Sequence, residues 1–333
     1  MSVHDRNKAT ARALCAALYS GTVQERRRAL MSAFAPDAKI RLGHPFQDVQ
    51  GSTDLWDRVW EPLLCAMPDL ERRDWILMSG PRWGEGKQGE WVGLGGNFVG
   101  TQTAPWLGIS PSDQPAFMRY QEYLRFEDGL IVEMEGLWDI PQLMKQQGVW
   151  PTADQQGVEW MCPGPANDRG MKETPYDEAK SKASVQLIWD MLHDLKEGTA
   201  KDPERGLGGF WHDHAFWYGP TGLGTARGHQ GISRKIFKQF RDGLSENTRH
   251  LDDGVFFGDG SFVAFTGWPS GTAVHSGNGF MDLAPTGKRI SRRSLDFWRI
   301  ENNMIRECWV MVDVLDLYRQ LGTDVLSELR EAA

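Results

Sequence analysis

The sequence predicts an α+β protein of two similar domains, each with helices first and an antiparallel sheet after them. The chain has 333 residues, room for two domains of ~150 residues. A shift of 174 places residues 106–149 over 280–323 with ten of 44 positions identical, about 23%, where ~6% is expected by chance. In both copies, apolar residues recur first at every third or fourth position and later at every second. The observations together indicate a duplicated domain.

The helical patterns open each copy, and each later amphipathic helix is bounded by glycine. The helices are expected at 8–19, 23–34 and 52–66 in copy one and at 176–197 and 229–243 in copy two. A short strand precedes the amphipathic helix of each copy, at 38–42 and at 215–218. The match between copies extends here with a small change of register, since 34–43 faces 210–219 at a shift of 176 and Gly51 faces Gly228 at 177.

Long strands follow the helices in each copy. They are expected at 75–78, 90–99, 116–126 and 130–137, and at 254–257, 262–268, 289–300 and 304–312. Tight hairpins are indicated at Glu127-Asp-Gly129 and Glu301-Asn-Asn303, because Gly and Asn tolerate positive φ. We therefore expect the helices of each copy to pack on one face of a bent sheet.

The stretch between the copies is rich in Pro and Gly and has no sustained period, which is typical of a linker. The predicted organisation is a domain at 1–150, a linker at 151–174 and a second domain at 175–333.

Composition limits the partners and the location. The net charge is −8, so no broad basic field gathers nucleic acid or an anionic membrane. We find neither the apolar core of a secretory signal nor an apolar run of about 18 residues, and we expect a cytoplasmic protein. The four cysteines are far apart, with no CxxC pair, and His212-x-His214 has no evident third ligand, so no metal site is expected.

Several strings in copy two carry a family resemblance. They are Gly219-Pro220…Gly228, the loop 280–289, and Ile305-Arg-Glu-Cys-Trp309…Asp313…Leu317-Tyr-Arg-Gln-Leu-Gly322, with weaker versions in copy one. With this order of elements the chain resembles the SnoaL-like polyketide cyclase family of the nuclear-transport-factor-like fold. The resemblance implies two cone-shaped domains, each a curved antiparallel sheet wrapped around N-terminal helices with a pocket inside. It also implies an internal pseudo-dimer, either as a monomer or as a homodimer of such units.

In the aldol-type cyclases of this family, an Asp on the last strand works with a His on the strand before it. Counting back from the terminal Gln-x-Gly, the resemblance puts the Asp position at Gly136 and Val310. It puts the His position at Glu122 and Asp296. Both copies therefore lack the family pair and carry a carboxylate in place of the histidine.

Glu122 and Asp296 are the leading catalytic candidates. Each alternates along its strand with apolar and aromatic residues, so each carboxyl should enter a pocket wall. Burial raises the pKa of a carboxyl toward neutrality, which suits general acid/base work. The alternative is a buried acid paired with an arginine, for which Arg292 or Arg119 is available.

Other candidates are less specific. Asp139 and Asp313 are identical between the copies and follow the last strand, where an Asp caps a helix or faces a pocket. His44 and His275 lie at strand edges near the expected pocket mouth, as proton carriers or as packed residues. The candidates for substrate binding are Arg292, Trp298, Trp309, Tyr120, Trp106 and Trp138.

The predicted function is cofactor-independent acid/base catalysis on a small ring-containing or apolar organic molecule. The reaction would be an isomerisation, dehydration, cyclisation or hydrolysis. The pocket of copy two is favoured, because it keeps the better family motifs and more polar candidates. Few of the fifteen tryptophans are paired between the copies, which indicates two pockets lined differently. The alternative is a non-catalytic assembly module, or one that binds a small molecule such as a carbohydrate, since indole faces stack on sugar rings.

Overall fold

The computed structural model describes residues 2–150, 157–158, 161–167, 170–171, 175–198 and 203–332. Most of the predicted linker lies outside these residues. The chain divides into two compact units, unit 1 with 1–150, 166–176 and 324–333, and unit 2 with 151–165 and 177–323. The last ten residues, predicted in the second domain, group with unit 1, where the Arg330 side chain packs against Gly108.

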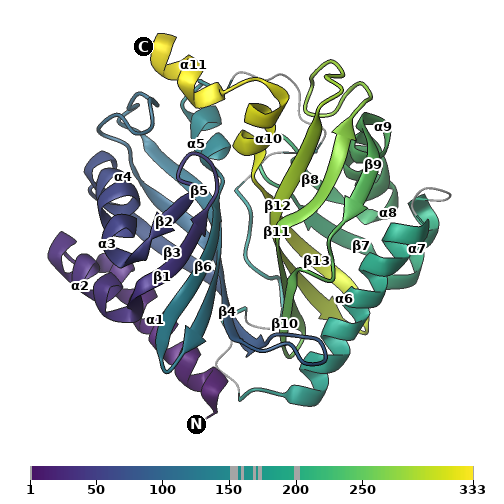
Figure 1. Ribbon diagram of the computed structural model, residues 1–333, viewed down its shortest axis with the longest axis horizontal. Coiled ribbons are helices and arrows are strands. Elements are labelled where there is room, and N and C mark those ends of the chain that lie inside the picture. The colour runs from purple at the N-terminus through teal and green to yellow at the C-terminus, as the bar shows by residue number, and fades with distance from the viewer. Residues whose placement is uncertain are drawn as a thin grey trace. The chain divides into compact units, whose positions relative to one another are not determined.

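Unit 1 consists of a six-stranded sheet whose N-terminal helices lie on one face (Figure 1). Its helices are α1 (Val3–Ser20), α2 (Val23–Ala33), α3 (Gly51–Leu55), the π-helical η1 (Trp56–Trp60), α4 (Glu61–Ala66), α5 (Ile140–Gln146) and α11 (Val325–Ala332). Its strands are β1 (Phe34–Leu42), β2 (Asp48–Gln50), β3 (Glu71–Pro81), β4 (Glu90–Thr101), β5 (Pro115–Glu127) and β6 (Leu130–Trp138). Capping boxes begin the first two helices, Ser2 with Asp5 and Thr22 with Glu25.

Unit 2 repeats this plan. Its helices are α6 (Glu178–Gly198), α7 (Pro203–Phe210), α8 (Gly228–Gly231), the π-helical η2 (Ile232–Phe237), α9 (Lys238–Gly243) and α10 (Val314–Leu321). Its strands are β7 (Trp211–Tyr218), β8 (Thr225–Arg227), β9 (Leu244–Arg249), β10 (Val255–Asp259), β11 (Phe262–His275), β12 (Arg289–Glu301) and β13 (Met304–Val312). None of the helices in the described part of the chain is long and apolar enough to cross a membrane.

The strand order confirms the predicted fold class of α+β with two curved sheets. The order is β2-β1-β6-β5-β4-β3 in unit 1 and β8-β7-β13-β12-β11-β10 in unit 2, where β9 also pairs with β11. The sheets are not wholly antiparallel as predicted, because the first long strand of each unit runs parallel to the last. The pseudo-dimer arrangement of the units stays a prediction.

Strand pairing corrects one detail of the predicted alignment. Lys39 pairs with Glu133 in unit 1, and Phe216 pairs with Glu307 in unit 2. Since Glu133 and Glu307 match at 174, β1 and β7 match at a shift of 177 and not 176. The same shift holds at Gly51 and Gly228, whose φ angles are 70° and 69°.

Residues identical between the copies build the scaffold. Arg125 and Arg299 each bridge two glutamates of the same hairpin, at positions that match between the units. Gln146 and Gln320 each bond both the backbone N–H and the C=O of a strand residue, Phe117 in unit 1 and its counterpart in unit 2. These two identical pairs therefore make the same contacts within both sheets.

Gly51 should tolerate no side chain. Its φ is positive, and an added Cβ would lie 2.2 Å from the Pro36 carbonyl oxygen. We expect Gly51→Ala to lower the free energy of unfolding by about 3 kcal/mol, since a left-handed conformation and a backbone clash add together. Gly129→Ala is the matched control, with φ of +82° and open space around it, and should cost only about 1 kcal/mol. Equal losses in denaturant unfolding would contradict the clash.

Candidate active site

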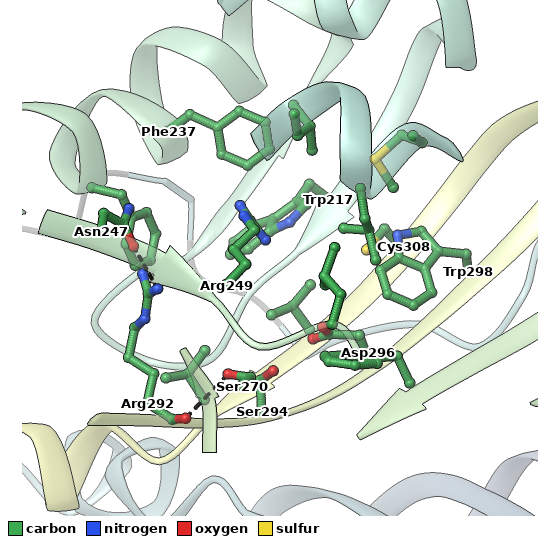
Figure 2. A pocket seen from close by; sticks show the side chains of 18 of the residues that line it. Trp217, Phe237, Asn247, Arg249, Ser270, Arg292, Ser294, Asp296, Trp298 and Cys308 are labelled. Atoms are coloured by element: carbon green, nitrogen blue, oxygen red, sulfur yellow. Dashed lines mark hydrogen bonds between the residues drawn. The ribbon is translucent and has the colours of Figure 1, made fainter. Parts of the chain in front are cut away.

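A cavity of about 430 Å³ lies between the helices and the sheet of unit 2 (Figure 2). Aromatic and aliphatic side chains form most of its wall, and its polar groups come from β9, β11, β12 and the region of α9. The lining residues are Met191, Leu192, Leu195, Trp211, Trp217, Phe237, Phe240, Arg241, Leu244, Asn247, Arg249, Leu251, Phe265, Ser270, Arg292, Ser294, Asp296, Trp298, Cys308, Val310 and Val312. A mostly apolar cavity with a few convergent polar groups is typical of a small-molecule site.

Asp296 lies in the wall of this cavity on β12, together with Arg292, Ser294 and Trp298. This is the alternation expected from the sequence. Burial raises the pKa of Asp296 to about 8, although the charge of Arg249 and a hydrogen bond with Ser294 both act to lower it. The carboxyl is therefore mostly protonated at pH 7 and can release and recover a proton near neutral pH.

Two arginines also enter the cavity. Arg292 donates to the side chain of Asn247 at 2.6 Å and lies over the Phe240 ring. Burial, and repulsion by Arg249, lower the pKa of Arg292 to about 9. Burial also lowers the pKa of Arg249, which Asp296 partly counteracts. The third lining arginine, Arg241, has a carboxylate 3.7 Å away in Asp242.

Glu122, the counterpart of Asp296, is buried in unit 1 and hydrogen-bonded on both carboxylate oxygens. Its carboxylate accepts from Arg72 at 2.6 Å and from the Trp138 indole at 2.9 Å. Arg72 also bonds Asp74 at 3.1 Å, and Asp74 accepts from the Tyr120 hydroxyl at 2.5 Å. Burial alone would lower the pKa of Arg72, but the two carboxylates outweigh it and hold that pKa well above its usual value.

The predicted alternative for these acids was an arginine partner, Arg119 or Arg292. The structure gives Glu122 such a partner, but it is Arg72 on β3, which lies 50 residues earlier in the chain and is brought to Glu122 by the folding of the sheet. Arg292 bonds Asn247 instead. Arg249 was also missed, although it follows Arg72 by 177 residues, the shift already evident at Gly51 and Gly228.

The register shows which side chains of unit 1 correspond to the cavity of unit 2. Tyr120 and Trp138 pair across β5 and β6, and their counterparts Ser294 and Val312 pair across β12 and β13. Phe98 pairs with Met118, as Gly271 pairs with Arg292. Three aromatic side chains therefore have small counterparts in unit 2, which explains the space beside Asp296.

In unit 1 the same aromatic side chains pack on one another. The Trp138 ring lies 4.9 Å from Phe98 and 5.8 Å from both Trp60 and Phe46, with Trp106 6.2 Å from Phe46. Tyr120, Trp106 and Trp138, predicted to bind substrate, are buried in this cluster.

Asp313 and Asp139 each stand directly before a helix. The Asp313 carboxylate accepts from the backbone N–H of Asp316 at 3.2 Å and from Arg293 at 3.3 Å, as an N-cap of α10 does. Asp139 is the N-cap residue of α5, where its backbone carbonyl accepts from Gln142. Asp313 does not line the cavity.

The two histidines predicted to carry protons lie away from the cavity of unit 2. His275 is buried at the end of β11, with Nδ1 3.1 Å from the Thr286 hydroxyl, and burial lowers its pKa. His44 belongs to unit 1, where its Nε2 lies 3.7 Å from Asp324. The structure does not bring either histidine to Asp296.

Of the tryptophans predicted to bind substrate, Trp298 lines the cavity. Trp309 does not, because Cys308 and Val310 beside it face the cavity and Trp309 points to the opposite face of β13. Its indole donates to the Pro163 carbonyl at 3.0 Å and stacks on Tyr218. Within the described residues, no three His, Cys, Asp or Glu side chains group to hold a metal ion.

Comparison with known proteins finds a family match within unit 2. Residues 196–321 match the family model described as SnoaL-like polyketide cyclase. No curated protein matches the chain. Among solved structures, AclR from Streptomyces galilaeus, a candidate hydroxylase, is 23% identical over 43% of this chain and 95% of its own, with a TM-score of 0.35.

Two further structures match in the same way. IdmH from Streptomyces antibioticus, a candidate polyketide cyclase, is 24% identical over 43% of this chain and 99% of its own, with a TM-score of 0.35. An NTF2-like protein from Burkholderia xenovorans is 17% identical over 43% and 98%, with a TM-score of 0.33. The chain is thus similar to the SnoaL-like polyketide cyclase family over residues 196–321, all of them within unit 2.

Proposed function

We propose that unit 2 is a cofactor-independent acid/base enzyme of the SnoaL-like polyketide cyclase type. It acts on a small ring-containing organic molecule, by isomerisation, dehydration, cyclisation or hydrolysis. The observation that carries the proposal is the buried carboxyl of Asp296, whose pKa is raised to about 8 in an aromatic-walled cavity. Such a carboxyl exchanges its proton near neutral pH, as proton transfer next to a carbonyl requires.

The roles follow from position in the cavity. Asp296 takes the proton from carbon and returns it to the same or another atom of the ring system. Trp298, Trp217 and Phe237 offer flat apolar surfaces that hold a ring beside the carboxyl. Glu122 is a structural ion-pair partner in unit 1, since Arg72 and Trp138 already occupy its oxygens. Localisation in the cytoplasm and a small-molecule partner remain part of this proposal.

A simple ring ketone tests the proposal without knowledge of the natural substrate. 2-Tetralone has acidic hydrogens next to its carbonyl, and their exchange for deuterium can be followed by NMR in D2O. We expect the full chain to accelerate this exchange, with a rate that rises with pH and levels off above a midpoint near 8, because the ionised Asp296 is the base. Ser294→Ala should move the midpoint upward, since it removes a hydrogen bond that lowers the pKa of Asp296.

A rate equal to the buffer background, or a profile that is flat between pH 6 and 9, would refute the proton-transfer role. The domain would then be a non-catalytic binding module, the alternative left open by the missing family Asp at Val310 and Gly136.

A further inference from the structure

The two units have an arginine at corresponding positions, but only unit 1 has a second carboxylate beside it. Arg72 pairs with Phe98, and Arg249 pairs with Gly271 at the corresponding place of its sheet, so the two arginines correspond. Two residues further along, Asp74 of unit 1 corresponds to Leu251 of unit 2, which lines the cavity. Unit 2 has thus lost one of the two carboxylates that surround the arginine in unit 1.

Unit 2 has also gained a positive charge. Arg292 corresponds to Met118 of unit 1, and it enters the cavity beside Arg249. Counting these groups as charged, Arg72, Asp74 and Glu122 sum to −1 in unit 1. Arg249, Arg292 and an ionised Asp296 sum to +1 in unit 2, or +2 when Asp296 is protonated.

The surroundings leave this positive charge unbalanced. Within the described part of the chain, no carboxylate lies within ion-pair distance of Arg249 or Arg292, and Arg292 donates to the side-chain amide oxygen of Asn247. Both guanidinium groups lose hydration in the cavity, and each repels the other. Guanidinium groups in such a setting bind a carboxylate through two parallel hydrogen bonds.

We propose that the substrate is an organic acid, whose carboxylate binds Arg249 and Arg292 in the place that the Asp74 carboxylate fills in unit 1, while its ring system lies beside Asp296. The inference names the substrate class of the proposed enzyme and so rests on that function. A bound anion would also counter the positive field of the arginines, so the ionised Asp296 would be a stronger base toward the ring system.

The probes are 2-naphthoate and 2-naphthamide, which share a ring system and shape and differ in charge. Binding to the full chain is measured by calorimetry at pH 7. We expect the naphthoate to bind at least tenfold more tightly, as charged hydrogen bonds allow. Arg249→Gln should remove most of this preference, whereas Arg289→Gln should keep it, because Arg289 is on the same strand as Arg292 but pairs with Glu246 outside the cavity.

Leu251 offers a second test with a matched pair of variants. Leu251→Asp restores the carboxylate that unit 1 has and should weaken naphthoate binding at least tenfold. Leu251→Asn has the same shape without the charge and should preserve the preference for naphthoate over naphthamide. If Leu251→Asp fails to fold, the Arg249→Gln result decides alone, because that variant relieves repulsion and should unfold no earlier than the parent chain.

Equal affinity for the acid and the amide, or a preference that survives in Arg249→Gln, would overturn the anion site. The exchange of 2-tetralone by the full chain separates this outcome from a failure of the proposed function. A preference for naphthoate with no exchange of 2-tetralone refutes the enzyme but keeps the anion site. Exchange of 2-tetralone without a preference for naphthoate refutes the anion site but keeps the enzyme.

Discussion

Asp296→Asn should slow the enzyme-catalysed exchange of 2-tetralone by about 100- to 10,000-fold, which is the rate factor that a positioned acid/base group contributes. Asn keeps the shape and the hydrogen-bonding reach of Asp but cannot carry the proton. Because the cavity wall is unchanged, 2-naphthoate should still bind. The measurement is exchange by NMR at pH 8.5, where most of the parent carboxyl is ionised.

The same variant carries an internal check on folding. The folded pKa of Asp296 is above its ordinary value, so its contribution to stability is fully present below about pH 4 and is lost as pH rises through about 8. Asp296→Asn should therefore exceed the parent chain in unfolding free energy by about 1 to 3 kcal/mol at pH 9, and the difference should disappear near pH 4.

Asp313→Asn is the matched comparison, since it makes the same chemical change at a buried aspartate that caps α10. Asn also caps helices well, so this variant should keep both the fold and the exchange. Full exchange activity in Asp296→Asn, or loss of exchange in Asp313→Asn alone, would move the proton carrier away from Asp296.

Arg72→Met should lower the free energy of unfolding by about 3 to 5 kcal/mol, the cost of removing one partner from a buried ion pair. The substitution leaves the carboxylates of Glu122 and Asp74 buried without their cation. The side chains of Arg72 and Glu122 are 2% and 3% exposed, so water cannot replace the lost contact. Denaturant unfolding of the full chain, followed at several wavelengths, measures the change.

Arg73→Met is the control, on the next residue of the same strand. Arg73 bonds Glu71 at 2.6 Å, but its side chain is 59% exposed, and exposed pairs contribute less than about 1 kcal/mol. The decisive comparison is with Arg249→Gln, the counterpart in unit 2. A loss as large there as in Arg72→Met would mean that Arg249 is a structural cation and not part of an open site.

The residues that are identical between the copies explain why the sequence predicts the fold better than it predicts the site. Arg125, Gln146 and their counterparts are kept in both copies because they hold the hairpin and the strand edge of each sheet. Those repeated positions predicted the duplication, whereas the spacing of apolar residues predicted the order of elements and the fold class. They contained little about the site, because most of the residues that line the cavity differ between the copies.

The sequence by itself determined that the chain is a duplicated α+β protein and that a carboxylate stands at matching positions 122 and 296. Strand alternation, a local property, also placed Arg292, Trp298 and Asp296 on one face. Only the tertiary structure showed that Arg72 binds the carboxylate of Glu122, whereas Asp296 lines a cavity together with Arg249. That difference depends on side chains from strands distant in sequence, and on whether Tyr120 and Trp138 or their small counterparts fill the space between them.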